Sequence, residues 1–115
     1  MLPPAEVITV AQTTGDSQLI TGAGIIVGWS FVEPTNSAPC SFELYDNTVA
    51  QGNLITSITL VTNESTRDLI GQNGLRFEMG IFFHRLTGTI KGSVWVIGLE
   101  HYSAGYATYV NPLIL

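Results

Sequence analysis

Histidine and cysteine are the side chains most able to bind a metal or attack a substrate, and this chain of 115 residues has few of them. His84 and His101 lie in different segments, with no cysteine or carboxylate at the spacing of a zinc site. Cys40 is the only cysteine, so the chain can form no internal disulfide, and no neighbour in the sequence would activate its thiolate. The sequence therefore predicts no metal site, no nucleophilic cysteine and no cofactor.

The acidic side chains are spread along the chain rather than paired. Glycoside hydrolysis needs two carboxylates held together in a cleft, whereas Glu43, Glu64 and Glu78 fall on separate strands and turns. Asp46 and Asn47 allow two interpretations, a loop that touches a cation or an aspartate that closes a turn, and the turn is favoured. Nucleophile-elbow, P-loop and dinucleotide-binding motifs are absent from the sequence. We therefore predict a protein that is not an enzyme and has no catalytic residues.

The composition predicts a protein partner. Charged residues make up 11% of the chain and hydrophobic residues 45%, against about 25% charged residues in an average soluble protein. The net charge is −5, and four scattered cations cannot form the basic stripe that nucleic acid requires or favour an anionic membrane. A surface poor in charge is typical of subunits that bury much of it in an assembly. Self-association, for example as a trimer, is therefore expected.

The start of the chain gives an expectation about localisation. The first residues, MLPPAEVITV, lack the basic start and the long apolar core of a signal peptide. No run reaches the ~18 apolar residues of a membrane span. We therefore expect a protein made in the cytoplasm, which stays there or leaves it within an assembly, and which does not contact a membrane.

Runs of β-branched and aromatic residues, separated by turn signals, predict about eight strands. They cover residues 6–12, 18–21, 25–32, 41–46, 54–62 and 75–77, and two more lie within 80–98. A short helix over 65–70, capped by Ser65, is the one helical alternative. The prediction is one all-β domain over 1–115, an antiparallel two-sheet sandwich of jelly-roll type, with an immunoglobulin-like topology as the alternative. Residues 1–5 are expected to form an N-terminal arm, and 102–115 a C-terminal strand or arm.

Residues 80–98 are predicted to be the element around which the chain is organised. They contain two strands joined by a tight turn at Gly88, and the second strand carries apolar residues on both faces. Ile90, Val94 and Val96 share one face, and Trp95, Ile97 and Leu99 share the other. A strand with one buried face would alternate apolar and polar residues, so this hairpin needs cover on two sides. Trp95 and Ile97 are therefore candidates for contact with another subunit.

The C-terminal segment HYSAGYATYVNPLIL is the second candidate interface. Its tyrosines alternate with small residues, and it ends in bare apolar side chains. Two interpretations remain open, a core strand or an arm laid on a neighbour, where tyrosine supplies a large contact area with a polar tip. The interface candidates in this segment are Tyr102, Tyr106, Tyr109, Leu113 and Leu115.

The order of motifs over residues 24–97 resembles that of small virion structural proteins of tailed bacteriophages. The resemblance rests on Gly28-Trp29-Ser30, on Leu44-Tyr45-Asp46 before a glycine-containing loop, on the polar stretch Glu64–Asp68, and on TGTIKGSVWV at 87–96. Asp46-Asn47 departs from the Asp-Gly that is common in such loops. The resemblance implies a β-sandwich subunit of the virion, often a capsid decoration or cement protein, with no catalytic residues.

Three functions follow as hypotheses from the composition and this resemblance. The first is a capsid decoration protein, which would bind the major capsid protein or another virion protein and stabilise the outer shell. The second is a tail, baseplate or fibre component of the same virion. The third is a carbohydrate-binding sandwich that uses Trp29, Trp95 or Tyr45 as a stacking platform.

Overall fold

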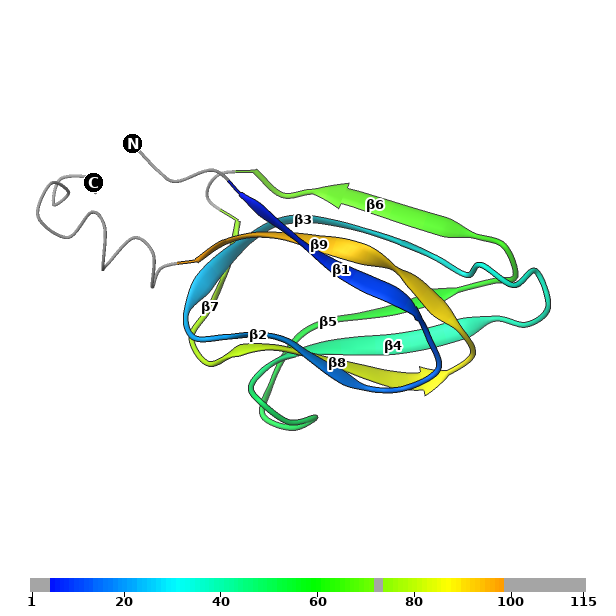
Figure 1. Ribbon diagram of the computed structural model, residues 1–115, viewed down its shortest axis with the longest axis horizontal. Coiled ribbons are helices and arrows are strands. Elements are labelled where there is room, and N and C mark those ends of the chain that lie inside the picture. The colour runs from blue at the N-terminus through cyan, green and yellow to red at the C-terminus, as the bar shows by residue number, and fades with distance from the viewer. Residues whose placement is uncertain (1–4, 72–73, 99–115) are drawn as a thin grey trace, which may run out of the picture.

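The computed structural model describes residues 5–71 and 74–98, which form two antiparallel sheets packed face to face (Figure 1). The first sheet, sheet A, contains β1 (Glu6–Thr13), β3 (Gly24–Val32), β6 (Ser65–Leu69), β7 (Leu75–Phe77) and β9 (Ile90–Gly98). The second, sheet B, contains β2 (Ser17–Thr21), β4 (Cys40–Asp46), β5 (Asn53–Leu60) and β8 (Gly80–Thr87). The predicted all-β sandwich is confirmed.

The order of the strands is that of a jelly roll. Sheet A runs β1-β9-β3-β6, with the short β7 also beside β3, and sheet B runs β2-β8-β4-β5. When β7 is left out, the first strand pairs with the last, the second with the last but one, β3 with β6 and β4 with β5. Pairs nested in this way, and alternating between two sheets, define the jelly roll. The jelly-roll prediction therefore holds, and the immunoglobulin-like alternative does not.

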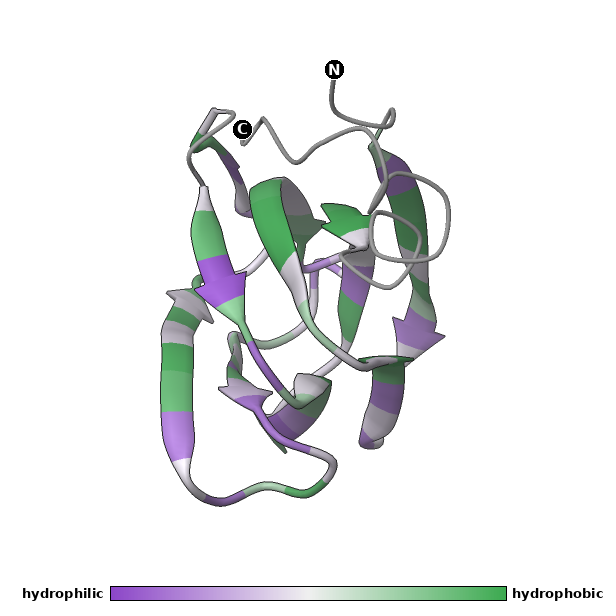
Figure 2. Cartoon of the chain, turned by 90° about the vertical axis from the view of Figure 1, so that its left-hand side faces the viewer, coloured by the Kyte–Doolittle hydropathy of each residue, from purple (hydrophilic) through white to green (hydrophobic). Residues whose placement is uncertain are grey.

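The core lies between the two sheets and is centred on three phenylalanines, one from each of β3, β4 and β8. The ring centroid of Phe42 lies 4.6 Å from that of Phe31 and 5.2 Å from that of Phe83. Apolar and polar residues alternate along several strands, as Figure 2 shows, because successive side chains of a strand point to opposite faces. Aliphatic side chains complete the core, among them Ile26, Leu44, Ile81, Ile90, Val94 and Val96, all fully buried.

The two strands within 80–98 do not form the predicted hairpin, because they belong to opposite sheets. β8 lies between β2 and β4 in sheet B, whereas β9 lies between β1 and β3 in sheet A. The turn at Gly88, where φ is +77°, carries the chain from one sheet to the other. A Cβ at Gly88 would lie 2.4 Å from the carbonyl oxygen of Pro39, so this crossing requires glycine. Both strands are central, which explains why each needs apolar residues.

The helix considered for residues 65–70 is wrong, because this segment is β6. It pairs antiparallel with the second half of β3, from Gly28↔Leu69 to Val32↔Ser65. An isolated helix of one turn is only marginally stable. These five residues have weak helical character, so pairing with a sheet stabilises them more than helix formation would. Pairing partners that are distant in the sequence therefore decide the structure here.

Gly28 marks both a bulge and a close backbone approach. The register between β3 and β9 shifts between Ile26 and Gly28. This shift places Ile26 in the core together with Trp29 and Phe31, although strict alternation would put Ile26 on the opposite face. A Cβ at Gly28 would lie 2.5 Å from Cε3 of Trp95, so only glycine lets that indole lie flat on β3.

A buried carboxylate joins two loops at one end of the sandwich. Glu33 is fully buried, and its side chain accepts hydrogen bonds from the backbone N–H groups of Thr35 (3.0 Å), Asn36 (2.9 Å) and Asn63 (2.9 Å), as well as from the Thr35 hydroxyl. Its own N–H donates to the carbonyl oxygen of Glu64 at 2.9 Å. The loop after β3 is thereby fixed to the turn between β5 and β6. These bonds lower the pKa of Glu33 to about 2.

Candidate functional site

The outward face of sheet A carries a surface centred on Trp95, which we call the Trp95 face. It comprises Val7, Arg67, Leu69, Lys91 and Trp95, which occupy outward positions on β1, β6 and β9. Val7 stands directly opposite Trp95 and is 61% exposed, and Leu69 stands opposite Gly28 and is 74% exposed. Strand pairing thus gathers apolar side chains that lie far apart in the sequence. Such a surface on a sheet face is suited to contact with another protein.

Trp95 is held rigidly at the centre of this face. One side of its indole lies on Gly28, and the guanidinium carbon of Arg67 lies 5.9 Å from the ring centroid, which is cation–π distance. The side chain is half-buried, so part of it remains available for contact. A rigid aromatic residue loses little conformational entropy on binding, which favours it as an anchor in an interface.

The other predicted interface residues are placed less favourably or lie outside the described residues. Ile97 stands opposite Ile25 and is 6% exposed, so it offers little surface to another chain. The C-terminal candidates Tyr102, Tyr106, Tyr109, Leu113 and Leu115, with the rest of 102–115 and with residues 1–4 of the N-terminal arm, lie outside the described residues. Contact of Trp95 and Ile97 with another subunit stays a prediction.

Strand pairing places two positively charged residues on the Trp95 face. Arg67 and Lys91 occupy outward positions, opposite Ser30 and Val32 respectively. Among the described strands of sheet A, Glu6 and Asp68 occupy inward positions, opposite Val96 and Trp29. The two cations therefore stand beside apolar side chains without a carboxylate from these strands next to them. Sequence reasoning treated the cations as scattered, because the pairing of β6 with β3 cannot be read from the sequence.

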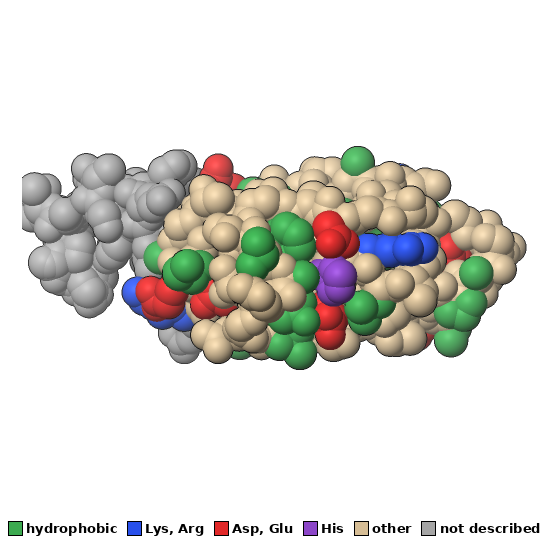
Figure 3. Space-filling view, turned by 90° about the horizontal axis from the view of Figure 1, so that it is seen from below, with side chains coloured by type: hydrophobic (Ala, Val, Ile, Leu, Met, Phe, Trp, Pro, Cys, Tyr) green, Lys and Arg blue, Asp and Glu red, His purple; other side chains and the backbone are tan. Residues whose placement is uncertain are grey.

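The outward face of sheet B carries a polar cluster that sequence reasoning did not assemble. Figure 3 shows its one described histidine, His84, between acidic side chains and beside apolar ones. Nδ1 of His84 lies 3.0 Å from Oδ2 of Asp16, and the Tyr45 hydroxyl donates to Oε1 of Glu43 at 2.8 Å. Glu43 stands opposite His84 across β4 and β8. The alternation in SFELYD placed Glu43 with Tyr45, but only the register brings His84 beside them.

Neighbouring groups shift the pKa of two residues in this cluster, Asp16 and Tyr45. Partial burial opposes ionisation of Asp16, but hydrogen bonds from the N–H of Arg85 and from His84 prevail and lower the pKa of its carboxyl. The hydrogen bond from Tyr45 to Glu43 raises the pKa of the phenol. Both carboxylates are thus engaged by neighbours of the same face. Asp16 fixes the turn between β1 and β2 to β8, and Glu43 orients Tyr45.

The positions of Trp29, Trp95 and Tyr45 show which of them could stack on a carbohydrate. Trp29 is 6% exposed, and its Nε1–H donates to Oδ2 of Asp68 at 2.9 Å, so its ring faces the core rather than solvent. Trp95 uses its indole against Gly28 and Arg67. Tyr45 is half-buried, and its ring centroid lies 6.3 Å from that of His84. Trp29 therefore cannot serve as a platform, and of the three residues Tyr45 has the most suitable setting.

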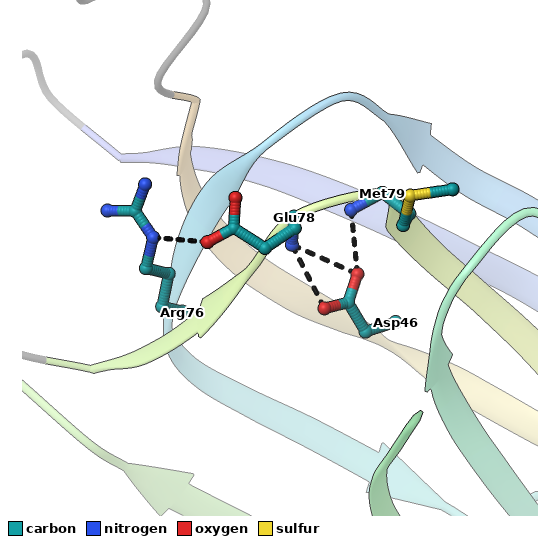
Figure 4. Close-up of polar contacts among 4 residues, drawn as sticks. All are labelled: Asp46, Arg76, Glu78 and Met79. Carbon is teal, nitrogen blue, oxygen red and sulfur yellow. Dashed lines mark hydrogen bonds and ion pairs between the residues drawn. The ribbon is translucent and has the colours of Figure 1, made fainter. Parts of the chain in front are cut away.

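Asp46 closes a turn, which is the interpretation that the sequence favoured, but this turn lies far from Asp46 in the sequence (Figure 4). Its carboxylate accepts hydrogen bonds from the N–H of Glu78 at 3.0 Å and from the N–H of Met79 at 2.8 Å. Both oxygens are engaged by the backbone between β7 and β8, which defines a structural role. Beside it, Nε of Arg76 lies 2.6 Å from Oε2 of Glu78. That ion pair is largely exposed and adds little stability.

We expect Asp46→Ala to destabilise the fold without disrupting it. The substitution leaves the N–H groups of Glu78 and Met79 without their acceptor, as the loss of a helix cap does, and should cost about 1 kcal/mol. Asp46→Asn retains one acceptor oxygen and is the matched control, with a smaller loss expected. Urea unfolding of the three proteins measures the difference. Equal stability of Asp46→Ala and the unmodified chain would contradict the role.

Groups able to bind metal are not assembled in the described residues. Among residues 5–71 and 74–98, no three His, Cys, Asp or Glu side chains come together as a metal-binding group. Cys40 is fully buried, and burial raises the pKa of its thiol. No helix in the described part of the chain is long and apolar enough to cross a membrane.

Comparison of the chain with protein-family models, with curated proteins and with solved structures gave no match. The proposals that follow therefore rest on the residues and contacts described above.

Proposed function

We propose that the chain is a structural protein of a tailed-bacteriophage virion, and that it decorates the capsid without catalytic activity. The observation that carries this proposal is the low charge and high apolar content of the surface. Large apolar side chains are exposed on both sheets and on the turns, while charged residues make up only 11% of the sequence. The exposed set comprises Val7, Val49, Leu54, Val61, Leu69, Leu75, Met79 and Leu86. A surface of this kind is suited to burial against other subunits.

The motifs that carry the phage resemblance have structural contacts in this fold, which supports a structural protein. Trp29 of the Gly-Trp-Ser strand bonds to Asp68 of the polar stretch, and the two segments pair as β3 and β6. Asp46 of the Leu-Tyr-Asp strand closes the turn before β8. Gly88 of the Thr-Gly-Thr turn lets the chain cross between the sheets.

The mechanism of such a protein is bridging. The sandwich core makes each subunit self-contained, and an outward face then bonds to the shell. Burial of apolar area contributes about 25 cal/mol per Å², so a face with several exposed aliphatic side chains can supply binding energy without a cofactor. A rigid central residue such as Trp95, with the guanidinium of Arg67 against its ring, gives that contact direction. The major capsid protein is the proposed partner.

Immunogold labelling of purified phage particles that encode this chain tests the proposal. We expect antibodies against the sandwich to label the outer shell over its whole surface. Label confined to the tail, baseplate or fibres would replace decoration with the alternative virion location. Particles that lack the protein altogether, by labelling and by mass spectrometry of their proteins, would overturn the proposal. Free protein from the same lysate is the control for antibody reactivity.

A further inference from the structure

β5 differs from the other strands that end the two sheets. Among the strands that the structure describes, it lies at the edge of sheet B beside β4, and it runs for eight residues, NLITSITL, without a charged residue or proline. Its pairing with β4 is regular from Thr56 to Leu60, after a single register shift near Ile55. An edge strand exposes a row of unpaired N–H and C=O groups, and proteins usually protect such rows with charges, bulges or short length. β5 has little of that protection.

The other three edges each carry a protective feature. β6 has five residues and includes Arg67 and Asp68. β2 also has five residues, and a register shift lies in its middle, between Gln18 and Ile20. β1 begins with Glu6 at an inward register position, and its register shifts once, between Val10 and Thr13. Among the described edge strands, β5 is the only long one without a charged residue, and this points to a strand that receives a partner.

We propose that β5 pairs antiparallel with β5 of a second copy of this chain, which joins two sandwiches through one continuous sheet. The strand is complementary to itself, because it contains no charge that a twofold-related copy would repel. Twofold pairing satisfies both edges in a single contact, whereas a foreign strand would leave the second copy's edge open. Ser57 and Thr59 are exposed on the outward side, and Ile58 lies against the core. Main-chain hydrogen bonds would supply the affinity, as in strand addition generally.

The symmetry of this pairing restricts the register. A twofold axis perpendicular to the sheet keeps the outward side of one strand continuous with the outward side of its copy. One residue of β5 must then stand opposite its own copy, with the axis passing midway between the two strands. Ser57, near the middle of the strand, is a candidate for that position. This inference names a partner for the proposed structural protein, but it concerns the purified chain and does not depend on location in the virion.

Lysine substitution provides the first test. Ser57→Lys places two like charges opposite each other in the twofold pair while its own side chain stays in solvent. Thr9→Lys makes the same change at an exposed position of the other long edge strand, β1. We expect the unmodified chain to dimerise in light scattering, Ser57→Lys to raise the dissociation constant about tenfold or more, and Thr9→Lys to leave it unchanged. A purely monomeric chain, or equal effects of the two variants, would overturn the proposal.

Cross-linking provides the second test and reports geometry. Cys40 is fully buried, so a single exposed cysteine can be introduced in turn at the exposed positions Leu54, Ser57 and Thr59 and treated with a short bis-maleimide. Antiparallel twofold pairing predicts dimers whose yield has a maximum at one position of β5 and is low for Thr9→Cys. A flat profile along β5, or a higher yield at position 9, would contradict it. Failure of particle labelling would leave these results unaffected, so the two proposals fail separately.

Discussion

Replacement of Glu33 by glutamine should destabilise the sandwich severely, with a fall of about 10 °C in the midpoint of thermal unfolding. In the native chain the buried carboxylate accepts four hydrogen bonds, three of them from backbone N–H groups. Glutamine has the same size but offers one acceptor oxygen and an NH2 group, which would face those donors. The loop after β3 and the turn before β6 would lose the group that joins them. Circular dichroism during heating measures the effect.

The same residue predicts how stability depends on pH. The pKa of Glu33 is lowered to about 2 from its usual value of 4.5, mainly by the hydrogen bond from the Thr35 hydroxyl. A carboxyl with a lowered pKa stabilises the fold above its unfolded pKa, and that contribution is lost as the pH falls towards the folded value. We therefore expect the unmodified chain to lose stability between about pH 5 and pH 2, and Glu33→Gln to lose less over the same range.

Glu64→Gln is the matched control for both measurements. Glu64 lies in the same turn, but its exposed carboxylate accepts only one described hydrogen bond, from the N–H of Val61 at 2.8 Å. Its substitution should change the unfolding temperature little. If Glu33→Gln unfolds at the same temperature as Glu64→Gln, or if both show the pH dependence of the unmodified chain, then Glu33 does not hold the two loops together.

The sequence predicted the fold better than it predicted which strands are neighbours. Period-two alternation and turn residues are local signals, so strands such as β4 and β9 could be placed almost to the residue. The number of strands and the scarcity of helix then favoured the jelly roll. Pairing across the sheets is not a local property: residues 80–98 looked like a hairpin, although the turn at Gly88 carries the chain between sheets. One bulge at Gly28 was enough to move Ile26 into the core.

The candidate surfaces could likewise be predicted only in part, because they depend on strand pairing. Trp95 was identified from its place on a two-faced strand, and the structure keeps it on an outward face. Its neighbours Val7 and Leu69 reach that face through strands more than twenty residues away in the chain, so no window of sequence could have grouped them. The exposed edge of β5 was equally hidden, because a sequence shows that a strand is uncharged but not that it ends a sheet.

Gly92→Ala is expected to have the second large effect, because Gly92 is where β9 packs most tightly on β3. A Cβ at this position would lie 2.2 Å from the carbonyl oxygen of Ser30 and 2.5 Å from Cδ1 of Phe31. Backbone on one side and a core ring on the other leave little room for adjustment, and overpacking of this kind costs about 3 kcal/mol. Urea unfolding should show a large fall in the midpoint at nearly constant slope.

Gly98→Ala makes this test specific, since it introduces the same methyl group into the same strand. A Cβ at Gly98 would meet no atom of the described residues within 4 Å, so stability should be unchanged or slightly raised through the lower entropy of the unfolded chain. Trp29 lies on β3 and Trp95 lies on β9. Tryptophan fluorescence therefore reports whether these two strands separate when the variants unfold. Equal stability of the two variants would show that β3 and β9 can move apart freely. The Trp95 face would then lack the rigid base that its proposed role as an anchor requires.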